Sequence, residues 1–251
     1  MEKNVDDSIE KAEKRAIISS SGDFTEFDKH ISVSGSTKIS GGKVDKSIRI
    51  SGSGKINGDL ECNGLTSSGS LEGSGNITVH GDISSSGTFI VAGFLYGNES
   101  ADFAGSAQVG NIVTIQESLI VSGSFRGGNF VRGEQGVELS GSSEINGNLS
   151  SEKTIKINGS TEIEGNVVAE NIIIGTLEKI KKQHYRIHGS IFAKNDVSII
   201  RTRVERDIKG RNVKIGQGSE ILGNVYYVEN IEVNEKTKLA NEPIQIKLEE
   251  L

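Results

Sequence analysis

The sequence predicts an all-β fold, a single-stranded triangular β-helix (β-solenoid) with about 18 residues per turn. Three observations lead to this prediction. The chain is rich in glycine but nearly free of proline, its glycines recur at intervals of 17 or 18 residues, and its apolar residues follow the same interval.

The composition favours many short strands joined by tight corners. Glycine accounts for 32 of 251 residues, about 13% where about 7% is usual, whereas proline occurs once. Corners without proline leave the strands free to use all their N–H groups. The apolar residues are mostly Ile, Val and Leu, which suit strands, and tryptophan is absent. We therefore expect a narrow core of branched aliphatic side chains.

Two columns of small residues mark the corners. The first consists of Gly35, Gly52, Gly69, Gly87, Gly105, Gly123, Gly141 and Gly159. Six residues after each lies a second column, Gly41, Gly58, Gly75, Gly93, Asn111, Asn129, Gly147 and Gly165. Because glycine and asparagine both tolerate a positive φ, we interpret the two columns as residues that turn corners.

Apolar residues lie on the same interval. Four residues before each glycine of the first column stand Ile31, Ile48, Leu65, Ile83, Ala101, Leu119, Val137 and Ile155. Further apolar positions follow two residues later, a spacing that points side chains to one side of a strand. Each turn therefore comprises three six-residue segments around an aliphatic interior. A β-sandwich with chance alignment does not explain eight consecutive matches.

The repeat divides the chain into three regions. Residues 1–28 are charged and carry no repeat, which predicts a flexible arm in which 5–18 could form a short helix. Residues 29–246 form the β-helix, and 247–251 form a C-terminal tail. The register resumes at Tyr185 and again at Val213, which predicts excursions from the repeat at 174–184 and 199–212.

Charge, cysteine and hydropathy exclude several classes. A net charge of −6 argues against a general binder of polyanions. The single cysteine, Cys62, excludes an intramolecular disulfide, and its inward position predicts a buried structural thiol. No apolar run approaches the length of about 18 residues that a membrane span needs, and no export signal is visible. We expect a soluble, cytoplasmic protein.

No pattern points to catalytic, cofactor-binding or metal-binding residues, so we expect neither an enzyme nor a small-molecule substrate. The alternative is a hexapeptide-repeat-type acyltransferase, in which a histidine acts as general base on a triangular solenoid. None of His30, His80, His184 and His188 has a carboxylate partner that the repeat places reliably. A surface-binding solenoid would need a regular Thr or aromatic array, whereas the outer positions here are mixed.

One segment differs in charge from the rest. Residues 176–214 contain 11 basic and 4 acidic residues, a charge of +7, which leaves −13 on the rest of the chain. The basic contact candidates are Lys179, Lys181, Lys182, Arg186, Arg201, Arg203 and Arg206. The segment is either a solvated basic face or a contact for an anionic partner, which includes the acidic body of another subunit.

The turns resemble those of a known family. Residues 48–60 (IRISGSGKINGDL) look like turns of bactofilins, the bacterial polymer-forming cytoskeletal proteins, and 210–233 (GRNVKIGQGSEILGNVYYVENIEV) is similar to the C-terminal turn of a two-part branch of that family. The resemblance covers roughly 31–246. It implies a right-handed β-helix that joins end to end into filaments without nucleotide, with itself or with a related bactofilin-like subunit. Since no metal site is visible, we expect no metal requirement.

The ends of a solenoid are its natural junctions. A terminal turn exposes unpaired N–H and C=O groups and an aliphatic cross-section, which must be capped or paired. The polymer-junction candidates are therefore Ile31 and Val33 at one end, and Ile231, Val233 and Leu239 at the other.

Overall fold

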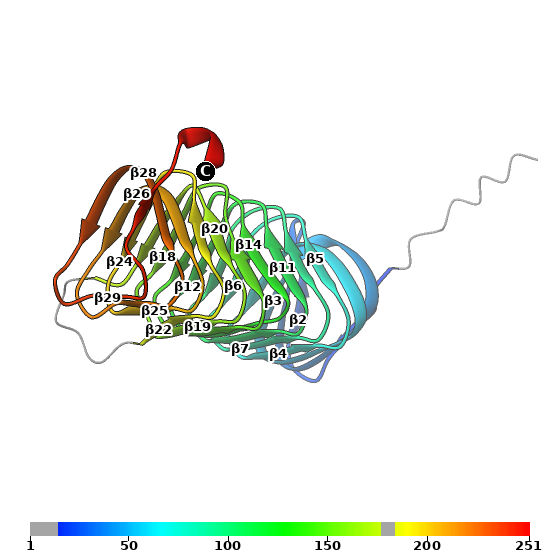
Figure 1. Cartoon of the computed structure of the whole chain (residues 1–251). Coiled ribbons are helices and arrows are strands. Elements are labelled where there is room, and N and C mark those ends of the chain that lie inside the picture. Colours follow the sequence, from blue (N-terminus) through cyan, green and yellow to red (C-terminus); the bar gives the residue numbers. More distant parts are fainter. Residues whose placement is uncertain (1–14, 177–183) are drawn as a thin grey trace, which may run out of the picture.

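The computed structural model describes residues 15–176 and 184–251, and it confirms the predicted fold (Figure 1). From residue 30 onward the chain winds into a β-solenoid in which the strands of one turn pair in parallel with those of the next. In the middle of the rod, Leu119 and Val121 lie opposite Val137 and Leu139. The residues of each pair are 18 positions apart, which is the interval of the sequence repeat.

Strand β3 (His30–Ser67) runs through the first turns, after which the strands form three faces. The first face contains β6 (Ile83–Ser85), β9 (Ala101–Phe103), β12 (Ser118–Val121), β15 (Gly136–Leu139), β18 (Thr154–Ile157), β21 (Asn171–Ile174), β24 (Asp196–Ile199) and the last residues of β26 (Ile208–Ile215) and β28 (Val225–Val233). The second contains β4 (Ser70–Gly73), β7 (Thr88–Val91), β10 (Ser106–Val109), β13 (Ser124–Gly127), β16 (Ser142–Ile145), β19 (Thr161–Ile163), β22 (Tyr185–Ile187), β25 (Thr202–Val204), β27 (Glu220–Ile221) and β29 (Lys238–Leu239). The third contains β5 (Ile77–Val79), β8 (Leu95–Gly97), β11 (Ile112–Ile115), β14 (Phe130–Gly133), β17 (Asn148–Ser150), β20 (Val167–Ala169), β23 (Ile191–Ala193), the first residues of β26 and β28, and β30 (Ile244–Gln245).

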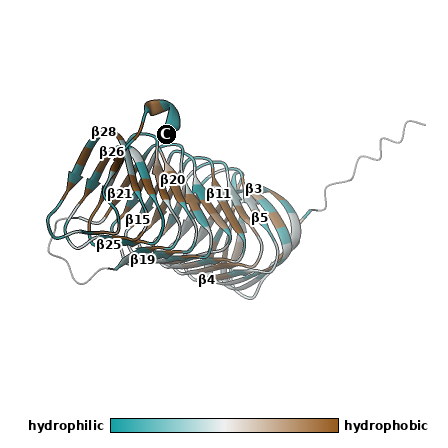
Figure 2. Cartoon of the chain, in the orientation of Figure 1, coloured by the Kyte–Doolittle hydropathy of each residue, from teal (hydrophilic) through white to brown (hydrophobic). Residues whose placement is uncertain are grey.

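The core lies inside the three faces and is aliphatic, as the sequence predicts. Ile155 and Ile157 of one turn are fully buried, and the intervening Lys156 is exposed. The hydropathy colours recur from turn to turn along the same faces (Figure 2). Cys62 is buried, and this burial raises the pKa of its thiol to about 12. The predicted buried thiol is confirmed.

The corner glycines are explained by stacking and only rarely by a positive φ. Within the corner columns of the described chain, only Gly35 and Gly58 have a positive φ, of 74° and 96°. At Gly141, however, an added Cβ would overlap the carbonyl oxygen of Gly123 one turn earlier. Consecutive turns stack at strand spacing, so the corner backbones touch directly and leave no room for a side chain. The interpretation from positive φ is therefore wrong for most of these positions.

Residues 15–27, which we call the N-terminal cap, run against the first turn. β1 (Ile18–Ser20) pairs antiparallel with Thr37–Ile39 of β3, and β2 (Phe24–Glu26) pairs antiparallel with Ile31–Val33. The N–H of Ala16 donates to the Lys43 carbonyl at 3.0 Å. This part of the predicted flexible arm 1–28 is thus paired structure. Residues 1–14, and with them most of the predicted helix at 5–18, lie outside the described residues.

One of the two predicted excursions is present and the other is wrong. Between β21 and β22 the chain leaves the repeat, so that Glu162 and Arg186 are neighbours across turns although 24 residues separate them. Residues 177–183 of this excursion lie outside the described part of the chain. At 199–212 the chain stays in the ladder, because β25 pairs with β22 and β26 pairs with β24, and the only irregularity in the pairing of β26 with β28 is a register shift between Gly210 and Asn212. Tyr185 belongs to the second face whereas Val213 belongs to the first, so the interval between them is not a turn plus an insertion.

The chain ends in a short 3₁₀ helix, η1 (Leu248–Glu250), within the predicted tail 247–251. Leu248 and Leu251 border a surface pocket of about 380 Å³ together with Val168 and Phe192, so the tail lies along the outside of the third face. Within 15–176 and 184–251, no helix has the length and apolar character needed to cross a membrane.

Candidate functional site

At the C-terminal end of the rod, the last strand of each of the three faces pairs on one edge only within the described chain. Ile231 and Val233 lie on β28 opposite Val213 and Ile215, and Leu239 lies on β29 opposite Ile221. Within the described chain, no strand pairs with the other edge of Asn230–Val233 or of β29. The third face ends in β30, which pairs with Tyr226 and Tyr227 on one edge and with no strand of the described chain on the other.

The junction candidates at this end are partly exposed. Ile231 and Leu239 are half-buried against the core, and Val233 is 41% exposed. Each has a strand neighbour on the preceding turn and, among the described residues, none on a following one. Unpaired backbone groups and aliphatic side chains therefore occur together, which is the combination that an end-to-end contact requires.

The N-terminal candidates are placed differently. Ile31 and Val33 are only 8% and 2% exposed, and β2 pairs with the strand edge that carries them. The expectation that they lie at an open edge is wrong, because the chain folds back and supplies its own partner. The outer side of the N-terminal cap carries Ile17, Phe24 and Phe27, which are 72%, 48% and 47% exposed.

Two of the basic contact candidates are engaged by acids on adjacent turns. Arg186 Nη1 lies 3.4 Å from Glu162 Oε1, and Arg203 Nη1 lies 2.6 Å from Glu220 Oε2. These residues form one outward column on the second face, in which Glu162, Arg186, Arg203 and Glu220 stand on successive turns. Parallel stacking thus converts the basic segment into a ladder of intramolecular ion pairs.

The remaining basic contact candidates do not form a cluster of positive charge within the described chain. Arg201 has a left-handed backbone, with a φ of 52°, and its Nη2 donates to the Thr176 carbonyl at 2.9 Å. Arg206 is exposed. Lys179, Lys181 and Lys182 lie outside the described residues. An anionic partner for segment 176–214 stays a prediction that these contacts do not strengthen.

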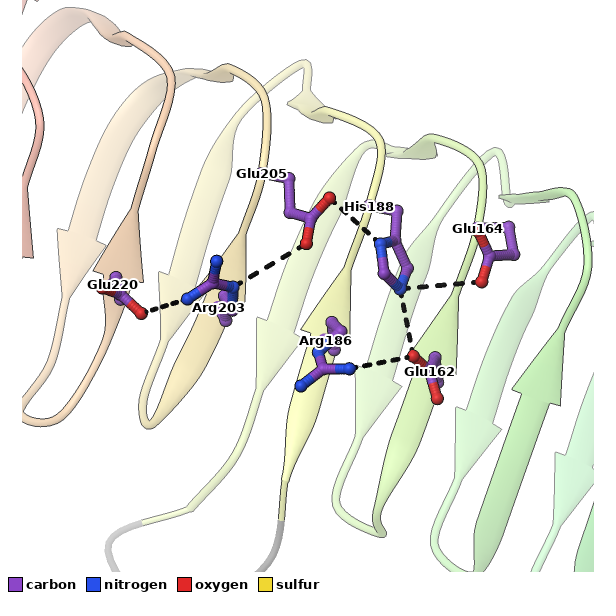
Figure 3. Close-up of polar contacts among 7 residues, drawn as sticks. All are labelled: Glu162, Glu164, Arg186, His188, Arg203, Glu205 and Glu220. Carbon is purple, nitrogen blue, oxygen red and sulfur yellow. Dashed lines mark hydrogen bonds and ion pairs between the residues drawn. The ribbon is translucent and has the colours of Figure 1, made fainter.

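Three glutamates surround His188 at a corner that spans consecutive turns (Figure 3). His188 Nε2 lies 3.0 Å from Glu162 Oε1 and 3.6 Å from Glu164 Oε1, and His188 Nδ1 lies 3.1 Å from Glu205 Oε2. Because Ile163, Ile187 and Val204 are in register, the residue that follows each of them falls into one column. We call Glu162, Glu164, His188 and Glu205 the His188 cluster.

The electrostatics of the His188 cluster follow from these contacts. The hydrogen bond with Glu162 raises the pKa of His188 above its ordinary value, and the contacts with Glu205 and Glu164 act in the same direction. The same hydrogen bond lowers the pKa of Glu162. With 24% of its side chain exposed, His188 remains accessible from solvent.

The sequence expectation that the histidines lack carboxylate partners is wrong at two positions. Besides His188, His80 has its Nε2 2.9 Å from Glu61 Oε1. His30 stacks on Phe27 with ring centroids 4.4 Å apart, and His184 is exposed. The excursion after β21 hid the His188 cluster, because it separates Glu164 from His188 by more than one regular turn. Aligning Ile163 with Ile187 across the excursion would have shown it.

No protein-family model matches the chain, and neither a curated protein nor a solved structure does. The resemblance to bactofilins therefore rests on the repeating turns of the sequence alone.

Proposed function

We propose that this chain is a structural scaffold that self-assembles end to end into filaments, without nucleotide or metal. The observation that carries the proposal is the open C-terminal end, where the last turn presents unpaired strand edges beside Ile231, Val233 and Leu239. As in the bactofilins that its turns resemble, the partner would be another copy or a related subunit, and the site of action the cytoplasm.

Unpaired backbone groups and exposed aliphatic side chains at the last turn are unfavourable in water. A second copy that pairs with the edges of β28 and β29 would continue the ladder at the strand spacing of about 4.8 Å. It would also cover aliphatic side chains that the preceding turn covers on one side only. Strand pairing and burial of aliphatic side chains both favour association at this end, and neither requires a bound cofactor.

A filament needs a second contact, and the N-terminal cap supplies a candidate. β1 and β2 pair with β3 on one edge, and no strand of the described chain pairs with their other edge. The exposed Ile17, Phe24 and Phe27 lie on the same segment.

The proposal is tested with the purified full-length chain in buffer that contains a chelator and no nucleotide. Negative-stain electron microscopy should show filaments, and analytical ultracentrifugation should show assembly that grows with protein concentration. A chain that stays monomeric at every concentration, or that assembles only with nucleotide, would refute the proposal. Turnover of an acyl-CoA substrate would instead favour the acyltransferase alternative.

A further inference from the structure

We propose that Glu162, Glu164 and His188 form a binding site for one divalent transition-metal ion, with Zn²⁺ as the best match. Glu205 acts on this site as a positioning residue that orients the imidazole. The site lies on the side of the rod at β19 and β22, so it is separate from the open C-terminal end and does not depend on the proposed assembly.

The donor atoms are close to the spacing that zinc requires. Tetrahedral Zn²⁺ with nitrogen and oxygen ligands at about 2.0–2.2 Å places neighbouring donors about 3.3–3.6 Å apart. His188 Nε2 lies 3.0 Å from Glu162 Oε1 and 3.6 Å from Glu164 Oε1. One ligand atom from each of the three residues lies within 4.8 Å of the others. Both glutamate side chains are exposed and can rotate toward a bound ion, and the three protein donors would leave one tetrahedral position to water.

The donor set selects among metals. One imidazole nitrogen and two carboxylates suit zinc, cobalt, nickel or copper, whereas Mg²⁺ and Ca²⁺ prefer shells made of oxygen alone. Two carboxylates with a neutral imidazole carry a charge of −2, which a divalent ion balances. Arg186 Nη1 is 3.4 Å from Glu162 Oε1 and competes for that oxygen, so binding requires the guanidinium to move aside.

The second ring nitrogen of His188, Nδ1, contacts Glu205, and this contact can orient the imidazole. Glu205 Oε2 lies 3.1 Å from His188 Nδ1, so Nδ1–H can donate to Glu205, and the proton by which Nε2 donates to Glu162 would have to leave for Nε2 to bind a metal (Figure 3). A carboxylate on the distal nitrogen of a metal-binding histidine fixes its tautomer and raises its basicity. Glu205 is held in turn by Arg203, whose Nε lies 3.7 Å from Glu205 Oε1.

The position of the site gives the metal a structural consequence. Glu162 and Glu164 belong to the turn before the excursion, and His188 belongs to the first turn after it. A metal bound to all three would tie together the two turns that the excursion separates. We therefore expect bound Zn²⁺ to raise the melting temperature, since a ligand of the folded state alone stabilises that state.

The test is isothermal titration calorimetry of ZnCl₂ into the chelator-treated, dialysed full-length chain. We expect one Zn²⁺ per chain, at least tenfold weaker binding in His188→Gln and in Glu164→Gln, and a loss of about 10–100-fold in Glu205→Gln. His80→Gln is the matched control, because His80 also pairs with a glutamate, and it should bind as the unchanged protein does. MgCl₂ and CaCl₂ should give no comparable heat.

The second readout is the melting temperature with and without ZnCl₂, which should rise in the unchanged protein and in His80→Gln but not in Glu164→Gln. Glu164 is exposed, so this variant is suitable if His188→Gln fails to fold. Absence of stoichiometric Zn²⁺ binding, or unchanged affinity in His188→Gln and Glu164→Gln, would overturn the proposal. Either result leaves the assembly test in chelator untouched.

Discussion

The first turn of the rod is covered by an antiparallel segment, whereas the strands of the last turn have outer edges that no strand of the described chain covers. At the N-terminal end, Ile31 and Val33 are buried under β2. At the C-terminal end, Ile231 and Leu239 are half-buried, and Val233 is 41% exposed. Both ends consist of similar turns, so the difference comes from the flanking chain.

This difference teaches that a repeat specifies the body of a solenoid but not the state of its ends. Each interior turn has two neighbours and each terminal turn has one. A reversed segment can replace the missing neighbour, because antiparallel pairing also satisfies backbone N–H and C=O groups. Assembly is therefore expected mainly at the C-terminal end.

The largest loss of stability is expected from a substitution in an interior turn, with which substitutions at the two ends can be compared. Ile155→Lys places an ammonium between Val137 and Ile172, where no partner is available, and should cost several kcal/mol of unfolding free energy. The exposed neighbour is the control, because Lys156→Glu should cost less than about 0.5 kcal/mol. Denaturant unfolding measures both, and equal midpoints would contradict the inward and outward assignment.

Removing the N-terminal cap should make the two ends alike. Deletion of residues 1–27 exposes Ile31 and Val33, and at about 1.5–3 kcal/mol per exposed side chain the loss should be about 3–6 kcal/mol. It should also increase end-to-end association, because a second set of parallel edges becomes available. Deletion of 1–14 is the control, since it leaves β1 and β2 in place. If both deletions sediment alike, the N-terminal cap does not restrain that end.

A charge at the C-terminal end should block assembly and leave the fold intact. Leu239→Arg adds a cation that each new junction would have to desolvate, so the association constant should fall more than tenfold. Leu222→Arg adds the same charge at a residue that is 42% exposed and follows β27, on the side of the rod. Sedimentation and circular dichroism separate the two variants. Filaments that persist in folded Leu239→Arg would show that this end is not the junction.

The smallest effect should come from shortening a half-covered side chain. Ile155→Ala should cost about 2–5 kcal/mol, because the interior cannot collapse around the cavity. Ile231→Ala should cost about 1 kcal/mol when the protein is dilute, since a half-buried residue has less contact to lose. Thermal unfolding over a range of concentrations checks this. A cost for Ile231→Ala that grows with concentration would place Ile231 inside a junction.

Much of the fold could be predicted from the sequence, because columns of Ile, Val, Leu and Gly repeat once per turn. The N-terminal cap could not be predicted in this way. Its strands run in the opposite direction, so Ala16 and Ile18, which pack against the core, fall outside the repeat. Pairing with the first turn is a long-range contact that no local pattern records. The same limit explains why Ile31 and Val33 were expected at an open edge.

The candidate site was less accessible to prediction. The open positions of Ile231, Val233 and Leu239 follow from being last in the repeat, and the structure places them there. The His188 cluster depends on which residues meet after the excursion, and the intervals along the chain do not reveal this. Charge alone makes Arg186 and Arg203 candidates for contact with an anionic partner, whereas stacking places each beside a glutamate of a neighbouring turn.

The contact between corner backbones has a consequence for how such a rod can change in length. Gly141 stacks on Gly123 without room for a Cβ, and Gly123 stacks in the same way on Gly105. A deletion of residues 119–136 would join Ser118 to Val137 and bring Gly141 above Gly105, since Ser118 and Gly136 hold equivalent positions. A deletion of half that size would set side chains against the bare corner. The rod can therefore gain or lose length only in whole turns. Insertions or deletions of one turn in the gene are the changes that can lengthen or shorten such a protein.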